Sequence, residues 1–188
     1  MKRLFVAINL PAEIKINIAD LIRELNEIGL PKDIRFVLPE NWHFTIIFLG
    51  YQEASAVPLI QKAMTAVKSE FENKKLEISL EELTYGPKDR TPRMIWLNAT
   101  QKSSKIIEEI KNKLETRLEE NRINWQRENR PYHGHITLAR FEPKSPKSLP
   151  LIATKINLSF PIASLDLMES TLRRSGPIYE KLFSVVLR

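Results

Sequence analysis

Two short segments carry the residue types from which an acid–base site could be built. The segment 41–50 contains His43 and Thr45, and the segment 132–140 contains His135 and Thr137. Successive side chains of a strand point to opposite faces, so a histidine and a threonine two residues apart share one face. The apolar residues between and after them share the other face. Each segment therefore predicts a strand with one core face and one face that bears an imidazole and a hydroxyl.

Two such strands facing each other would suit chemistry at phosphorus. One imidazole can accept a proton from an attacking water while the other gives a proton to the leaving oxygen. Two threonine hydroxyls can donate hydrogen bonds to a phosphate between them. A 2′,3′-cyclic phosphodiester fits, because its leaving ribose oxygen needs a proton, and no metal is required. A single His-x-Thr pair is common on half-buried strands, but two copies that use two of the three histidines indicate a site.

Composition narrows the class of protein. The chain has 188 residues, 43% of them hydrophobic, which suits one compact domain, residues 1–188. It has no cysteine, which excludes disulfides, thiol nucleophiles and cysteine-based zinc sites. The net charge of +6 suits a polyanionic partner such as RNA, although a solvated basic surface would give the same value. No signal peptide or membrane-spanning run is evident, so we expect a cytoplasmic monomer that does not contact membranes.

Helical and extended patterns alternate along the chain. Extended runs are predicted at 4–8, 34–38, 42–50, 76–80, 94–99, 135–140, 152–160, 162–172 and 178–187. Helices are predicted from Pro11, from near Ser55 and after residue 102, the last capped by Ser103 or Ser104. These elements predict an α+β fold.

The first part of this pattern repeats. A shift of 92 residues places His43 on His135, Thr45 on Thr137 and the first helix on the third. We therefore expect two repeat-like halves, roughly 1–90 and 91–188, related by a pseudo-twofold axis. Their boundaries stay open, because the C-terminal strands can return to either lobe.

The motifs resemble those of a known family. The matching segments are Arg3–Ile8, Pro39–Thr45 with Phe48–Gly50, Pro92–Leu97, His135–Arg140, and Ser170–Leu172 with Gly176–Tyr179. They are similar to the 2H phosphoesterase superfamily, in its branch of RNA 2′,3′-cyclic phosphodiesterases, the 2′-5′ RNA ligase-like (LigT/ThpR-type) proteins. The resemblance implies a bilobal fold of two mostly antiparallel sheets with flanking helices and a central cleft. It also implies no cofactor, and hydrolysis of RNA 2′,3′-cyclic phosphate ends to 2′-phosphomonoesters.

The same resemblance implies roles for five residues. His43 and His135 become the acid–base pair, and Thr45 and Thr137 become the phosphate-binding hydroxyls. By analogy we expect His43 to be the acid on O3′ and His135 the base, a choice that sequence symmetry does not decide. Arg140 ends the second motif and is expected to neutralise phosphate charge. On a flat strand its parity is opposite to that of Thr137, so it would reach the cleft only through twist or strand-end geometry.

Two positions depart from the family pattern, and others could assist binding. Gly134 stands where proline is frequent, and Ile47 stands where a basic residue is frequent. His133 is either an exposed loop histidine or a substrate contact. The remaining candidates, for base stacking or for guiding RNA, are Trp42, Tyr85, Trp125, Tyr132, Tyr179, Arg122, Arg127 and Arg130.

Three rival functions remain open. The same site run in reverse would join a cyclic phosphate end to a 5′-hydroxyl, which is 2′-5′ RNA ligation. A non-catalytic module that binds nucleotides or RNA ends would keep the cleft without turnover. A metal-dependent hydrolase would use His133 and His135 as ligands, but no third ligand lies at suitable spacing.

Overall fold

The computed structural model describes residues 1–188 except 73, 129, 145, 153–154, 174–175 and 188. The helices in the described part of the chain are α1 (Ala12–Leu25), α2 (Val57–Phe71) and α3 (Gln101–Glu120). The strands are β1 (Lys2–Asn9), β2 (Arg35–Phe36), β3 (His43–Gln52), β4 (Glu77–Gly86), β5 (Met94–Ala99), β6 (His135–Arg140), β7 (Lys155–Pro161), β8 (Ser164–Arg173) and β9 (Gly176–Val186). Short 3₁₀ turns lie at Pro39–Asn41, Ala54–Ala56 and Pro146–Ser148.

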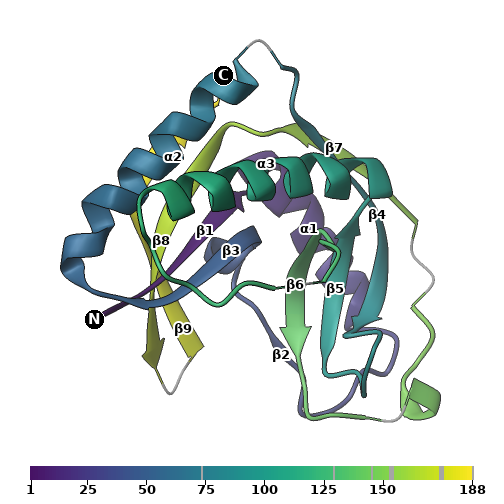
Figure 1. The fold of residues 1–188 in the computed structure, drawn as a ribbon. Helices are drawn as coiled ribbons and strands as arrows, with labels where there is room; N and C mark the ends of the chain where they lie inside the picture. Colours follow the sequence, from purple (N-terminus) through teal and green to yellow (C-terminus); the bar gives the residue numbers. More distant parts are fainter. Residues whose placement is uncertain (73, 129, 145, 153–154, 174–175, 188) are drawn as a thin grey trace.

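The strands form two antiparallel sheets. The first has the order β3-β1-β8-β9 and the second has the order β2-β6-β5-β4-β7. The two strands that carry the His–Thr pairs, β3 and β6, belong to different sheets and contact each other. In Figure 1 the sheets lie side by side beneath α3. The expected α+β class with two antiparallel sheets is confirmed.

Helices α2 and α3 cover one side of this arrangement. They pack against each other, α2 contacts β9, and α3 contacts β3, β4 and β5, so α3 bridges the two sheets. Leu4, Val6 and Ile8 of β1 join the helices in the main core. Phe5 and Ala7 point to the opposite face, where they pack with Met168 in a separate cluster. The first sheet therefore has one face under the helices and a second face away from them.

The start of α3 differs from the expectation. Thr100, and not Ser103 or Ser104, is the N-cap, because its hydroxyl accepts a hydrogen bond from the Ser103 backbone N–H at 3.2 Å. Both serines are buried within the first turn. Their hydroxyls bond to neighbouring segments, and Ser103 Oγ accepts from the Ser79 N–H at 2.8 Å. The serines thus join α3 to the sheet.

Several strand boundaries also differ. β2 has only two residues, because it pairs only with the end of β6. β3 continues past Gly50, which has a φ of +69° and allows an irregular pairing with β1. β4 continues to Gly86, because its second half pairs with β5 as far as Met94, whereas β7 pairs only with its first half. The run predicted at 152–160 begins as a strand at Lys155, and residues 153–154 lie outside the described part. No described helix has the length and apolar character needed to span a bilayer.

Candidate active site

The turn before β3 fixes the direction of His43. Trp42 is buried, and its indole N–H donates to the Val37 carbonyl at 2.9 Å. The Asn41 side chain donates to the Pro177 carbonyl at 3.1 Å, at the start of β9. The two residues that precede His43 are therefore held by separate elements.

The His43 ring has a defined hydrogen-bonding pattern. Its Nδ1 lies 2.7 Å from the Asn41 carbonyl oxygen, and its Nε2 lies 3.1 Å from Thr45 Oγ1. Since a carbonyl only accepts, we assign the proton of the neutral ring to Nδ1. Nε2 then accepts from the Thr45 hydroxyl. The ring packs against Phe5 and Tyr179, at centroid distances of 5.0 and 5.3 Å.

The His135 ring makes the same kind of hydrogen bond through Nδ1. Its Nδ1 lies 2.8 Å from the carbonyl oxygen of the residue two positions earlier, His133. Its Nε2 has no hydrogen-bond partner in the described part of the chain. The ring stacks on Trp96 at 4.0 Å and 27°. The sequence prediction missed this contact, because it depends on the register of β5 against β6, in which Trp96 lies opposite Thr137.

Both motif strands contain a matching irregularity. The pairing skips Ile46 in β3 and Leu138 in β6, which are β-bulges that change the parity of the residues that follow. Phe48 and Arg140, each five residues after the motif histidine, therefore return to the histidine's face. The identical burial patterns of the two segments agree with this geometry. Arg140 thus reaches the site through a bulge, which the flat-strand parity did not predict.

The pKa shifts of His43, His135 and Tyr179 show that all three lie within reach of the Arg140 charge. The pKa values of His43 and His135 are lowered to about 4, chiefly by burial, although the hydrogen bonds that the rings donate to main-chain carbonyls raise them. The positive charge of Arg140 contributes to the lowering of both pKa values. It also lowers the pKa of Tyr179, which burial raises. One guanidinium therefore acts on groups from β3, β6 and β9, and both imidazoles are neutral near pH 7 in the free protein.

Tyr132 joins the two motifs directly. Its hydroxyl donates to the main-chain carbonyl of Thr45 at 2.7 Å, and its own N–H donates to Glu108 Oε1 at 3.1 Å. Burial raises the pKa of Tyr132, so the hydroxyl keeps its proton. The loop before His135 is thereby connected to α3 on one side and to the first motif strand on the other.

Gly134 is suited to its position between the two histidines of this loop. Its N–H donates to Ser104 Oγ at 3.2 Å, and its carbonyl accepts from the Ala99 N–H at 2.8 Å. A Cβ at this position would lie 3.0 Å from Ser104 Oγ. Proline, frequent here in the family that the motifs resemble, has no N–H to donate. Glycine and Ser104 therefore form a matched pair.

The aromatic candidates lie in different places. Tyr179 contacts His43, as described, whereas Trp42 is a core residue and the Tyr132 hydroxyl is engaged with Thr45. Tyr85 and Trp125 pack against the main core. Of the five aromatic residues proposed for stacking, only Tyr179 lies against a site histidine.

Three of the remaining basic and histidine candidates, Arg127, Arg130 and His133, have local partners. Arg127 lies over the Trp125 ring and pairs with Glu119, and Arg130 lies near Asp89 and Glu128. Arg122 lines the same hollow as Trp125. The exposed His133 contacts Asn98 Oδ1 at 3.1 Å through Nε2. Its main-chain carbonyl holds His135 Nδ1, and its ring stacks beside the His135 ring at a centroid distance of 5.8 Å.

The described residues include no cluster of three or more His, Asp or Glu side chains that could hold a metal ion. The groups that come together here are two imidazoles, the Thr45 hydroxyl and one guanidinium, and Thr137 lies on the same face of β6 as His135. They can exchange protons with a bound molecule and bind an anion.

Comparison with known proteins agrees with this geometry. The model of the family "LigT like Phosphoesterase" matches residues 8–96 and 100–179. An RNA 2′,3′-cyclic phosphodiesterase of Archaeoglobus fulgidus is 25% identical over 183 residues, covering 96% of this chain and 97% of the relative. The crystal structure of TT0787 of Thermus thermophilus has a TM-score of 0.78 at 24% identity, covering 99% of this chain and 98% of that one. That of E. coli LigT complexed with 3′-AMP has a TM-score of 0.74 at 25% identity, with the same coverage. The chain belongs to the LigT-like phosphoesterase family.

Proposed function

We propose that this protein hydrolyses the 2′,3′-cyclic phosphate ends of RNA to 2′-phosphomonoesters, without a metal or other cofactor. The observation that carries the proposal is the repeated device at the two histidines. Each ring is held at Nδ1 by the carbonyl two residues earlier, with a threonine two residues later on the same face. The printed names of relatives such as the A. fulgidus enzyme support the substrate class. Both histidines come from one chain, so a monomer is sufficient.

The two imidazoles divide the proton transfers. His135 accepts a proton from water at Nε2, which has no partner in the described structure, as the water oxygen attacks phosphorus. The P–O3′ bond breaks on the opposite side, and His43 gives its Nε2 proton to O3′. The product keeps its phosphate on O2′, and the step leaves His135 protonated and His43 neutral. Loss of the His135 proton to solvent and uptake of a solvent proton by His43 restore the starting state.

The hydroxyls and the guanidinium bind the phosphate. Thr45 donates to His43 Nε2 in the free protein. When Nε2 takes up a proton, the Thr45 hydroxyl is released and can donate to a phosphate oxygen instead. Thr137 supplies the second hydroxyl from β6, and Arg140 supplies a full positive charge.

Substrate binding favours the uptake, from solvent, of the proton that the acid needs. Both pKa values are about 4 in the free protein, so neither ring carries a charge near pH 7. A bound phosphodiester places a negative charge beside the rings and offsets the positive charge of Arg140. Its charge therefore raises the pKa of the histidines and favours a protonated His43 in the complex.

The test is turnover of a short oligoribonucleotide that ends in a 2′,3′-cyclic phosphate, in the presence of excess EDTA. We expect the wild type to hydrolyse it, and His43→Ala and His135→Ala to lose about 10²–10⁴-fold in kcat, the usual contribution of a positioned acid or base. The matched control is His133→Ala, which removes the third histidine's ring but keeps the carbonyl that holds His135. Loss of turnover with EDTA, or full activity in either motif variant, would refute the proposal.

The rival functions give distinct results in the same experiment. An added oligonucleotide with a 5′-hydroxyl would be joined to the cyclic phosphate end if the site acts as a 2′-5′ ligase. Binding without turnover would indicate a non-catalytic module.

A further inference from the structure

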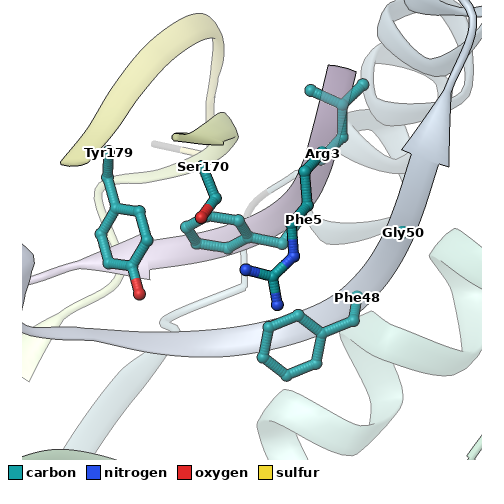
Figure 2. A pocket seen from close by; sticks show the side chains of 7 residues that line it. Arg3, Phe5, Phe48, Gly50, Ser170 and Tyr179 are labelled. Carbon is teal, nitrogen blue, oxygen red and sulfur yellow. The ribbon is translucent and has the colours of Figure 1, made fainter. Parts of the chain in front are cut away.

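A pocket lies on the same face of the first sheet as His43. Its volume is about 130 Å³, and its lining includes Arg3, Phe5, Phe48, Ser170 and Tyr179, which we call the Arg3 pocket. In Figure 2 the charged head of Arg3 lies between the rings of Phe5 and Phe48. Sites for whole small-molecule ligands measure about 300–1,000 Å³, so this pocket has room for one chemical group and not for a complete nucleotide.

The polar groups of the Arg3 pocket match an anion. Arg3 forms no ion pair within the described part of the chain, and its positive charge lowers the pKa of Tyr179, which burial raises. Ser170 is 8% exposed, and its Oγ has no hydrogen-bond partner among the described residues. A buried hydroxyl without a partner costs about 1–3 kcal/mol, so a ligand that accepts its hydrogen bond is favoured. A cation and a free hydroxyl on one hollow fit a phosphate oxygen.

Phe48 adds a surface of a different kind. The bulge in β3 turns it onto the histidine's face, in the position that corresponds to Arg140 in β6. It is 56% exposed, although its ring lies only 6.1 Å from that of Phe5. An exposed aromatic ring beside a cation is the combination on which single-stranded RNA stacks its bases.

The spacing from the two-histidine site identifies which part of the substrate the pocket receives. The Phe5 ring lies 5.0 Å from the His43 ring and forms a wall of the Arg3 pocket. A single aromatic ring therefore separates the pocket from the His43 ring. In an RNA that ends in a 2′,3′-cyclic phosphate, the next phosphate is the one that links the terminal nucleotide to its 5′ neighbour.

We propose that the Arg3 pocket binds this penultimate phosphodiester, through the Arg3 guanidinium and the Ser170 hydroxyl, while the neighbouring base stacks on Phe48. The inference rests on the proposed function, because it places the cyclic phosphate at the two-histidine site. It makes oligonucleotide ends the substrate class, in preference to mononucleoside 2′,3′-cyclic phosphates.

The test compares two substrates with the same terminal nucleotide, a mononucleoside 2′,3′-cyclic phosphate and the corresponding dinucleotide. We expect the wild type to have the higher kcat/KM for the dinucleotide. Arg3→Gln should lower that value about tenfold or more, as expected for a lost hydrogen bond to a charged group, and change the mononucleotide value less than about twofold. Ser170→Ala should act in the same direction. The control is Lys62→Gln, which removes one positive charge from an exposed position on α2.

A dinucleotide with an uncharged methylphosphonate link identifies the contact. For the wild type, kcat/KM on this substrate should be lower than on the normal dinucleotide by the same factor that Arg3→Gln causes. Arg3→Gln should then lower kcat/KM on the methylphosphonate no further. Three results would each overturn the proposal. The first is an equal loss of kcat/KM in Arg3→Gln on the mononucleotide and the dinucleotide, and the second is a wild type with no preference between these substrates. The third is a full Arg3→Gln effect on the methylphosphonate. Binding of the dinucleotide 2′-monophosphate, measured by calorimetry, should weaken by the same factor in Arg3→Gln. That measurement decides the matter even if neither cyclic phosphate is hydrolysed, in which case it is the proposed function that fails.

Discussion

Replacing Tyr132 by phenylalanine removes one oxygen atom and, with it, the hydrogen bond that joins the two motifs. The hydroxyl donates to the Thr45 carbonyl at 2.7 Å in a buried setting. Loss of such a bond should lower the free energy of unfolding by about 1–2 kcal/mol. For a chain of this size, that change lowers Tm by roughly 2–8 °C.

The same substitution should lower activity more than stability alone explains. Without this bond, the strand that carries His43 and Thr45 loses its hydrogen bond to the loop that precedes His135. A small displacement between an acid and a base reduces the rate steeply, so we expect kcat to fall about tenfold or more while the protein stays folded at the assay temperature. Urea unfolding and steady-state kinetics on the same preparations measure the two effects.

Two other tyrosines provide matched controls for Tyr132→Phe. The Tyr85 hydroxyl donates to the Pro150 carbonyl at 2.9 Å, away from either motif. Tyr85→Phe should therefore lower stability to a similar extent and leave kcat within about twofold. Tyr51 is 64% exposed, and Tyr51→Phe should change neither quantity. If Tyr132→Phe behaves like Tyr85→Phe in both assays, the bond serves stability alone and the reasoning is refuted.

Three further predictions concern charge and packing at the site. Arg140→Gln should move the inflections of the kcat/KM profile to higher pH, because the arginine charge lowers the pKa of His43 and His135; an unshifted profile would mean that it acts on substrate alone. In the folded protein the pKa values of His43 and His135 are about 4, below the usual 6.5, so between pH 4 and pH 6.5 the unfolded chain binds more protons than the folded one. The free energy of unfolding should therefore fall as the pH falls from 6.5 to 4. Urea unfolding should show a shallower pH dependence when both histidines are replaced by glutamine. Gly134→Pro should lower the free energy of unfolding by about 1–3 kcal/mol through loss of the Ser104 bond, and Ser104→Ala in that background should restore part of it, whereas a further decrease would contradict the packing argument.

Much of the site could be predicted from the sequence, because side chains alternate between the two faces of a strand. Alternation alone places His43 with Thr45 and His135 with Thr137, since it depends only on local backbone geometry. The 92-residue repeat relates the two pairs. The hydroxyl–imidazole contact at His43 follows directly from that spacing.

Features that depend on pairing between distant strands could not be predicted in this way. The face of Arg140 is set by a bulge, which arises from the register of β5 against β6. The Trp96 stack and the Tyr132 bond join residues that the sequence gives no local reason to connect. The cap at Thr100 was missed for a related reason, because burial of the first turn of α3 engages Ser103 and Ser104 elsewhere.

In the proposed reaction, water attacks the cyclic phosphate and O3′ leaves with a proton from His43. The most direct measurement is single-turnover hydrolysis of a cyclic phosphate oligonucleotide in ¹⁸O-labelled water with EDTA, followed by mapping of the product end and its mass. We expect a 2′-phosphomonoester that carries one ¹⁸O atom on phosphorus, formed by the wild type and lost in both His43→Ala and His135→Ala. A 3′-phosphate product, or a 2′-phosphate without the label, would contradict the proposed reaction.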